Sequence, residues 1–290
     1  MMLLVPSDPL RPRRPDEHFA DEYAAARDAG LDVALVDHDA LAAGADPDAA
    51  VARVPESDDA VYRGWMLRSE RYASFAAALA RRGVTMRTGA EAFRSSHELP
   101  GWYATLREVT AESAIANGFG RDAFDACRSA LGSGPAVLRD WVKSAKHHWA
   151  EAAYVPDVAD ADAAWRVASR FVEIRDDAAV GGFVLRRFET YGPAEVRTWW
   201  VAGRCALATA HPDTPDGAPP PDAALDAALD VLAPLVAAHG APFVTVDLAS
   251  RDDGVWRVVE LGDGQVSDRP RTNDAAAFVA AVLPSPLPEA

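Results

Sequence analysis

The first feature that could do chemistry is a short basic segment, Arg139-Asp-Trp-Val-Lys143-Ser-Ala-Lys146. The chain has 29 lysines and arginines, and its only two lysines lie three residues apart in this segment. Because lysine and arginine side chains differ in geometry and hydration, a lysine pair in an arginine-rich chain indicates a need for compact ammonium groups. As a strand, the segment would place Arg139, Trp141 and Lys143 on one face; as a helix, Arg139, Lys143 and Lys146. Either arrangement favours a polyphosphate ligand over an ordinary basic surface.

A second group of side chains comes from two apolar stretches near the end of the chain. Val244-Thr-Val-Asp247-Leu-Ala precedes a short polar turn, and Trp256-Arg-Val-Val-Glu260-Leu-Gly-Asp263 follows it. In a hairpin with an even-numbered loop, Asp247 and Glu260 share a face, roughly 4.5 to 8 Å apart. Carboxylates at that separation repel each other unless a proton or cation intervenes, and Mg²⁺ bound to phosphate meets this need. The alternative is two ordinary acids facing solvent.

Other catalytic signatures are weak or missing. The sequence has no phosphate loop of the form G-x-x-x-x-G-K-[ST], no G-x-G-x-x-G, no H-E-x-x-H and no G-x-S-x-G. His147 and Glu151 could bind a metal from a helix, but no third ligand is evident, so stacking or capping roles are favoured. Arg63, Trp65 and His97 could face a substrate, although core or loop roles are favoured for each.

The elements that must position these residues begin with a parallel β-α-β unit. Residues 3–6 and 32–37 are typical of buried strands, and the pattern over 16–29 predicts the helix between them. The proline- and arginine-rich stretch 8–14 predicts a loop. The first hundred residues are therefore expected to form a small α/β domain, with further strands over 60–67 and 84–87 and a helix over 69–82.

The rest of the chain predicts a second set of helices and strands. Helices are expected over 105–115, 122–131, 161–174 and 222–239, and strands over 136–142, 182–188, 195–201, 205–210, 243–249 and 255–261. The last two strands form the hairpin that carries the paired carboxylates.

Composition excludes several function classes. The chain of 290 residues carries a formal charge of −15, which repels phosphate backbones and argues against broad nucleic-acid binding. No apolar run approaches the roughly 18 to 20 residues of a membrane span, so no membrane association is expected. Cys127 and Cys205 are the only cysteines, so a reducing, cytoplasmic setting is expected.

The order of these parts resembles the ATP-grasp superfamily. Glu195-Val-Arg197 before an aromatic strand is similar to the D-I-R strand of ribosomal-protein glutamate ligases, and the stretch from Val-Asp247-Leu to Val-Glu260 is similar to their metal-binding hairpin. The opening VPSDPLRPRRPDEHFADE and the later YRGWML are similar to the clade named for one arginine and two lysines. The resemblance implies an α/β (α+β) chain with an ATP-grasp fold and an N-terminal, Rossmann-like pre-ATP-grasp α/β domain. The implied boundaries are 1–104 for that domain, 105–185 for a small lid subdomain and 186–290 for the C-terminal subdomain.

The same resemblance implies ATP and Mg²⁺ as cofactors and assigns residues to them. Arg139, Lys143 and Lys146 would hold the phosphates of ATP. The backbone of the hinge, with Arg186, Phe188 and Glu189, would hold adenine. Glu195 would reach the ribose. Arg197 would hold the γ-phosphate or an acyl phosphate, with Lys143 as the second catalytic residue. Asp247 and Glu260 would hold Mg²⁺. The asparagine usual two residues after the glutamate is Gly262 here, and Asp263 or Gln265 could supply the missing oxygen.

The implied activity is ligation of a carboxylate to an amine through an acyl phosphate. Phosphoryl transfer to a carboxylate brings anions together, so cationic clamps and Mg²⁺ supply most of the catalysis and no protein nucleophile is needed. The expected partners are small-molecule or peptide carboxylates and amines. Two alternatives stay open: phosphoryl transfer without ligation, and a degenerate module that binds or senses nucleotide without turnover. The sequence does not specify the substrates or the oligomeric state.

Overall fold

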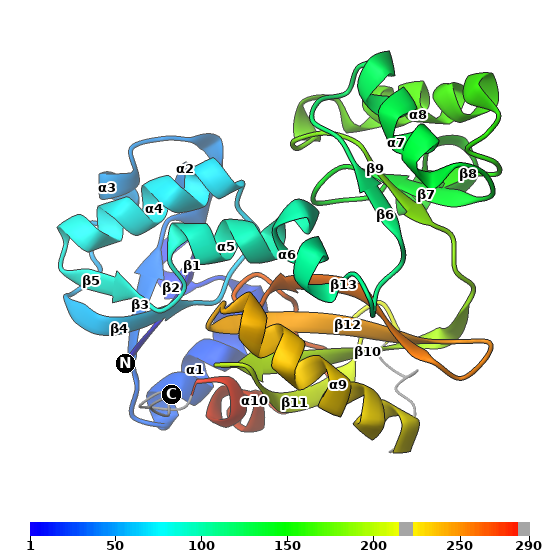
Figure 1. Ribbon diagram of the computed structural model, residues 1–290. Helices are drawn as coiled ribbons and strands as arrows, with labels where there is room; N and C mark the ends of the chain where they lie inside the picture. The colour runs from blue at the N-terminus through cyan, green and yellow to red at the C-terminus, as the bar shows by residue number, and fades with distance from the viewer. Residues whose placement is uncertain (215–222, 284–290) are drawn as a thin grey trace. The chain divides into compact units, whose positions relative to one another are not determined.

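The computed structural model describes residues 1–214 and 223–283 and divides into two compact units (Figure 1). Unit 1 contains Met1–His97, Pro193–Ala249 and the chain from Glu260 onward; unit 2 contains Glu98–Gly192 and Ser250–Val259. Each unit combines sheet with helices, which confirms the expected α/β class. The three-part division at residues 104 and 185 stays a prediction. No helix in the described ranges has both the length and the apolar character needed to cross a membrane.

Unit 1 begins with a mostly parallel sheet built around β1 (Met2–Asp8). β1 lies between β3 (Asp32–Val36) and β4 (Ser57–Tyr62) and is parallel to both. With α1 (Ala20–Asp28) as the connecting helix, the predicted β-α-β unit is confirmed. The other elements of this part are β5 (Val84–Met86), η1 (Glu17–Phe19), α2 (His38–Ala43), α3 (Pro47–Ala50), α4 (Ser69–Arg81) and α5 (Ala90–His97).

The prediction of a loop over residues 8–14 is wrong, because Arg11–Pro15 forms the edge strand β2. β2 folds back on β1 as an antiparallel neighbour. The carboxylate of Asp8 closes the turn by accepting hydrogen bonds from the backbone N–H groups of Leu10 and Arg11, at 2.9 and 3.0 Å. Prolines are tolerated in an edge strand because one row of its backbone groups has no ladder partner.

The second sheet has the order β11-β10-β12-β13. Its strands are β10 (Tyr191–Val201), β11 (Arg204–Ala210), β12 (Phe243–Arg251) and β13 (Trp256–Asp263). The predicted strands over 195–201 and 205–210 are confirmed as an antiparallel pair. Helix α9 (Ala223–His239) contacts β11, as Figure 1 shows, and matches the predicted helix within the described residues.

A hydrophobic core joins the two sheets of unit 1. Leu3 and Val5 of β1 pack with Trp199 of β10 and with α10 (Ala275–Val282). The ring of Phe278 on α10 lies edge-on to Trp199, 4.7 Å between centroids. This packing fixes β10, and with it the polar side chains that β10 carries.

Unit 2 is built on an antiparallel sheet in the order β6-β9-β7-β8. The predicted helix over 105–115 is wrong, because α6 ends at Leu106 and residues 113–115 pair with β9 instead. Phe124, Phe171 and Phe183 form the centre of its core. The elements of this unit are β6 (Ser113–Ile115), β7 (Ala136–Arg139), β8 (Tyr154–Val155), β9 (Val184–Arg187), α6 (Leu99–Leu106), α7 (Arg121–Leu131), α8 (Ala161–Arg175), η2 (Lys146–His148), η3 (Trp149–Ala153) and η4 (Asp176–Ala178).

Candidate functional site

A buried ion pair joins neighbouring strands of the second sheet of unit 1. Arg197 on β10 donates from Nε to Oδ1 of Asp247 and from Nη2 to Oδ2, both at 2.8 Å. Arg197 is 9% exposed and Asp247 is 5% exposed. Two parallel charge-assisted hydrogen bonds fix both groups in one orientation. Arg197 and Asp247, to which the family resemblance assigns a phosphate and Mg²⁺, therefore lie side by side.

The electrostatics of this pair keep both groups charged. Burial alone would raise the pKa of the Asp247 carboxyl, but the charge and hydrogen bonds of Arg197, helped by His211, hold that pKa well below its usual range. Burial also works against the charged form of Arg197, yet Asp247 and the nearby Glu260 raise its pKa. Glu260 therefore lies close enough to Arg197 to act on its charge.

His211 belongs to the same charged group, although it was not predicted from the sequence as a site residue. Its Nε2 lies 2.8 Å from Arg197 Nη2 and 3.5 Å from Asp247 Oδ2. Its Nδ1 lies 3.7 Å from Glu195 Oε2 and accepts a hydrogen bond from the backbone N–H of Asp213 at 3.1 Å. Both ring nitrogens are therefore engaged. The two predicted strands over 195–201 and 205–210 could have indicated His211. Its backbone N–H donates to Glu195 O just beyond the last paired residues of that hairpin, so His211 lies beside the start of the strand that carries Arg197.

The three predicted metal ligands do not come together. The described residues hold no group of three or more His, Cys, Asp or Glu side chains able to bind a metal ion. Mg²⁺ needs only one or two protein carboxylates when phosphate oxygens complete its shell. Asp247 is ionised, which is the form that a metal requires, and Glu260 is close to the same arginine. These two residues fit Mg²⁺ together with a bound phosphate.

Asp263, the third predicted ligand, lies on the other face of β13 from Glu260, because the two are an odd number of strand positions apart. Asp263 is fully buried, and its Oδ1 accepts hydrogen bonds from the backbone and side-chain nitrogens of Gln265 at 3.0 and 3.1 Å. Gln265 also donates to the hydroxyl of Tyr72 at 2.8 Å. Burial raises the pKa of Asp263 to about 7 against the opposing hydrogen bonds from Gln265. Both candidates for the missing metal oxygen thus serve a buried network.

The predicted phosphate-binding residues lie in unit 2, in a tight turn after β7. The strand ends at Arg139 and Lys146 begins η2, so neither a continuous strand nor a helix runs through the segment. The backbone N–H of Asp140 donates to Lys143 O at 2.9 Å, and the Lys143 residue is exposed. The buried Arg139 guanidinium donates to the backbone carbonyls of Asp140 and Val142. Arg139 therefore braces the turn that presents Lys143.

The side chain of Asp140 organises this turn. It is fully buried, and its Oδ1 accepts from the backbone N–H groups of Val142 and Lys143 at 2.7 and 2.6 Å. Its Oδ2 accepts from Nε and Nη2 of Arg175 at 3.1 and 3.0 Å. A carboxylate that captures consecutive backbone donors specifies a turn locally. The backbone of Lys143 is consequently held in one conformation.

The predicted adenine hinge covers the end of β9 and the two residues that follow it. Arg186 is buried and donates to Val259 O at 2.6 Å and to Thr110 Oγ1 at 2.7 Å. Glu189 accepts from Nε and Nη2 of Arg257, each at 3.2 Å. Both side chains thus make internal contacts, which agrees with a hinge that would act through its backbone.

An aromatic cluster lies beside the hinge. The ring of Phe188 is 5.3 Å from Tyr154 and 6.2 Å from Trp149, and Trp149 stacks on Tyr154 at 5.6 Å. Trp149 is 43% exposed, so part of a large apolar ring faces solvent. It directly follows the helical turn that begins at Lys146. Phe188 was predicted from the sequence as part of the site, and the other two rings were not.

The weaker candidates have structural partners. Glu151 pairs with His148, the neighbour of the His147 that was considered and disfavoured as a metal ligand, with His148 Nδ1 2.7 Å from Glu151 Oε1. His97 is buried and stacks on Phe93 at 4.9 Å, in line with the favoured core role.

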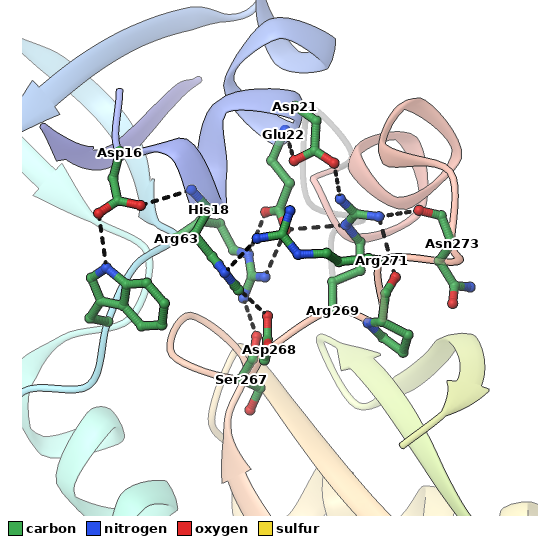
Figure 2. A network of polar contacts seen from close by, with 12 residues as sticks. Asp16, His18, Asp21, Glu22, Arg63, Ser267, Asp268, Arg269, Arg271 and Asn273 are labelled. Atoms are coloured by element: carbon green, nitrogen blue, oxygen red, sulfur yellow. Dashed lines mark hydrogen bonds and ion pairs between the residues drawn. The ribbon is translucent and has the colours of Figure 1, made fainter. Parts of the chain in front are cut away.

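Arg63 is the centre of a buried polar network, shown in Figure 2. Its Nε and Nη2 donate to the two carboxylate oxygens of Glu22 at 2.8 and 3.1 Å. Its Nη1 donates to the carbonyl oxygens of Gly264 at 2.6 Å and Ser267 at 2.8 Å. Arg269 also donates to Glu22, at 3.3 Å. The network ties the N-terminal sheet to the loop after β13, so the favoured core role of Arg63 holds.

Comparisons with known proteins agree with this architecture. A family model described as an ATP-grasp domain, family 3 of the clade named for one arginine and two lysines, matches residues 130–282. Similar solved structures include a RimK domain ATP-grasp protein from Sphaerobacter thermophilus DSM 20745, with 20% identity, a TM-score of 0.59, and 98% of this chain and 100% of that chain covered. D-cycloserine synthetase DcsG has 16% identity, a TM-score of 0.64, and coverage of 97% and 98%. The ATP-grasp ligase PsnB, complexed with a phosphomimetic variant of a minimal precursor, Mg and ADP, has 12% identity, a TM-score of 0.56, and coverage of 97% and 96%.

No curated protein significantly matches the sequence. The likeness to solved structures extends over nearly the whole chain, including the N-terminal parallel sheet. The expected ATP-grasp fold is therefore confirmed.

Proposed function

Because the chain belongs to family 3 of the ATP-grasp clade named for one arginine and two lysines, we propose that it is an ATP- and Mg²⁺-dependent ligase that joins a carboxylate to an amine. A free carboxylate is a poor electrophile, so it would first accept the γ-phosphoryl group of ATP to form an acyl phosphate. The amine would then displace phosphate. The observation that carries this proposal is the buried Arg197–Asp247 pair beside Glu260, which combines a cation suited to phosphate with two carboxylates suited to Mg²⁺.

Unit 1 would supply the groups that act at the transferred phosphoryl. Arg197 would bind the γ-phosphate and then the acyl phosphate, since a guanidinium attracts phosphate oxygens and its contacts with Asp247 and Asp268 hold it in one orientation. Asp247 and Glu260 would hold Mg²⁺, which supplies charge neutralisation at the phosphates when bound. Glu195 would reach the ribose. These groups work by position and charge, as phosphoryl transfer requires.

Unit 2 would supply the groups that hold the rest of the nucleotide. Lys143 and Lys146, with Arg139 behind them, would contact the phosphates, and the backbone around Phe188 would contact adenine. The partly exposed ring of Trp149 adds an apolar surface suited to a planar base. A cationic turn followed at once by aromatic rings is the combination that a nucleotide needs.

The substrates proposed are small molecules or peptides that carry a carboxylate or an amine. Similar solved structures include a D-cycloserine synthetase and a ligase bound to a minimal precursor, and both kinds of substrate suit this proposal. Nucleic acid is excluded from the proposed partners because the net charge is −15. Both cysteines are unpaired, in keeping with a proposed reducing, cytoplasmic setting.

A nucleotide-binding module without turnover is the second candidate. It is favoured by Gly262, which provides no side chain where the resembled family has an asparagine, and by Asp263, which faces the other side of its strand. ADP formation separates the two functions. Purified protein with ATP and Mg²⁺ should release ADP faster when pools of amino acids and short peptides are added. Tight ATP binding with no stimulated ADP release would favour the second candidate.

Lys143→Ala tests the nucleotide site itself. Loss of one charge-assisted phosphate contact costs about 1.5 to 3 kcal/mol, so ATP affinity should fall roughly 10- to 100-fold. His147→Ala is the matched control, because His147 is exposed in the following turn and has no assigned role. Thermal protection by ATP and Mg²⁺ would measure both variants. Equal protection of Lys143→Ala and the unmodified chain would contradict the placement of the phosphates.

A further inference from the structure

His18 is held by aromatic contacts on the surface of unit 1, in the short helix η1 after β2. Its imidazole lies 4.5 Å from the Trp65 ring and 4.8 Å from the Phe19 ring. Asp16 reinforces this contact, because Oδ1 accepts from the His18 backbone N–H at 2.8 Å and Oδ2 accepts from Trp65 Nε1 at 3.3 Å. The His18 side chain is still 21% exposed. The ring is therefore fixed in orientation and open to a ligand.

The polar contacts of His18 define where its lone pair points. Nε2 lies 2.7 Å from Oδ1 of Asp268, and Nδ1 lies 3.0 Å from Nη2 of Arg271, as Figure 2 shows. A guanidinium can only donate, so Nδ1 must accept. The ring proton then belongs on Nε2, where the Asp268 carboxylate accepts it. A doubly protonated ring would set a second N–H against the arginine donor, so a simple ion pair does not satisfy these contacts.

Asp268 also connects His18 to the proposed phosphate-binding residue. Its backbone carbonyl oxygen accepts a hydrogen bond from Arg197 Nη1 at 2.9 Å. The loop that carries Asp268 is held by Arg63, which binds the carbonyl oxygens of Gly264 and Ser267. One residue thus orients the imidazole through its side chain and the arginine through its backbone. Catalytic groups must be held in this way to act at one reacting centre.

We propose that His18 is the base that removes a proton from the attacking amine, with Asp268 and Trp65 as positioning residues. The proposal rests on the proposed ligase function and extends it to the second half-reaction. The amine nitrogen bonds to the acyl carbon while Nδ1 takes a proton from that nitrogen. The bond from the acyl carbon to the phosphate oxygen then breaks, and the leaving phosphate takes the proton from Nδ1. The products are the amide and inorganic phosphate, with a neutral imidazole restored.

Arg271 and His211 bear on this assignment. Arg271 is exposed and makes one contact with the lone pair of His18, so an incoming amine can replace it. His211 lies closer to the charged pair, but its Nδ1 accepts from the Asp213 backbone and its Nε2 faces Arg197. His211 therefore has no lone pair directed at a nucleophile.

Hydroxylamine separates the two half-reactions. It reacts with acyl phosphates without a protein base, so a trapped hydroxamate reports acyl phosphate formation, while amide formation from amino acids reports the complete reaction. His18→Gln keeps a donor for Asp268 and removes the base. With ATP, Mg²⁺ and pooled amino acids and dipeptides, amide formation should fall about 100- to 10,000-fold in this variant. Hydroxamate formation with the same pool should stay within about threefold of the unmodified chain.

Two further variants sharpen the test. Asp268→Asn should also lower amide formation more than hydroxamate formation, because the backbone contact to Arg197 survives the change. His239→Gln is the matched control, since His239 contacts Ser96 elsewhere in unit 1 and should leave both rates unchanged. Parallel loss of both products in His18→Gln, or amide formation within threefold of normal, would overturn the role of His18. If the unmodified chain forms neither product, the ligase function fails first and the role of His18 falls with it.

A measurement on the protein without substrates tests the same assignment. Long-range nitrogen–proton NMR of histidine-labelled protein should show His18 protonated on Nε2 and bare on Nδ1, with the signal assigned by its loss in His18→Gln. A proton on Nδ1 would leave no base at that position and would overturn the proposal.

Discussion

Asp263→Asn should make unit 1 more stable at neutral and alkaline pH, with an advantage over the unmodified chain that shrinks as the pH falls toward 3.8. Asp263 is fully buried, and its Oδ2 has no hydrogen-bond partner in the described part of the chain. Burial raises the pKa of this carboxyl from 3.8 to about 7. The folded chain therefore binds more protons than the unfolded chain between those values, and stability falls as pH rises through that window. Above about pH 7 the loss is complete.

The magnitude follows from the size of this change. Each pH unit between 3.8 and about 7 lowers the free energy of unfolding by about 1.4 kcal/mol. The loss over the whole range is therefore about 4 kcal/mol, of which about 3 kcal/mol falls above pH 5. An asparagine keeps an oxygen to accept from Gln265 and has no charge to bury. At pH 5 the carboxyl is ionised in the unfolded chain but protonated in the folded chain, so the variant should already be about 1.5 kcal/mol more stable than the unmodified chain. At pH 8 the variant should be about 4 kcal/mol more stable, so its advantage grows by about 3 kcal/mol between pH 5 and pH 8.

Urea unfolding at pH 5, 6, 7 and 8, followed by tryptophan fluorescence, measures this difference directly. Asp48→Asn is the control, because it removes the same charge from an ion pair whose members are each 54% exposed. Its effect should stay below about 1 kcal/mol at every pH. A stability difference for Asp263→Asn that is constant within 1 kcal/mol from pH 5 to 8 would refute the reasoning.

Two further substitutions test the packing and the buried ion pairs that stabilise units 1 and 2. Arg63→Met should lower the free energy of unfolding by about 3 to 5 kcal/mol, because the buried Glu22 loses its main partner. Arg81→Met, which removes a surface ion pair, should lower it by less than about 1 kcal/mol. Urea unfolding measures both variants, and similar losses would contradict the importance of the buried pair. Gly182→Ala should destabilise unit 2 by about 1 to 3 kcal/mol or more, because a Cβ there would collide with a backbone carbonyl oxygen. Gly89→Ala is the control, because a Cβ at that position meets open space. The melting temperature should fall for Gly182→Ala only, and equal melting temperatures would contradict the prediction.

The regular patterns of the sequence predicted much of the fold. Buried strands flanking a helix at residues 3–37 predicted a parallel unit, because that spacing allows few other connections. Alternation along the last two predicted strands indicated which of their residues share a face, although the pairing of Arg197 with Asp247 across β10 and β12 was not itself predicted. These predictions succeeded because period and spacing are local properties.

Other features depend on contacts that no local pattern contains. Residues 113–115 were predicted as helix, but pairing with β9 outweighs the local preference. The turn at Lys143 depends on Asp140, whose Oδ2 is held by an arginine 35 residues further on. His18 and Asp268 are 250 residues apart and meet only in the folded chain. Long-range partners of this kind explain why the proposed base was not predicted from the sequence, while the strands that carry Arg197 and Asp247 were.

The glycine at position 262 has a physical explanation in the residues around it. A Cβ at Gly262 would lie 3.3 Å from Thr245 Oγ1 and 3.5 Å from Ser267 Oγ, and these two hydroxyls are 2.7 Å apart in a hydrogen bond. The hydroxyl pair therefore occupies the space in which a longer side chain would begin. Ser267 lies on the loop held by Arg63, next to the residue that orients His18. The absent asparagine is thus linked to the loop that carries Asp268, since a side chain at position 262 would press on the Thr245–Ser267 pair and require Thr245 to shift by a few tenths of an ångström.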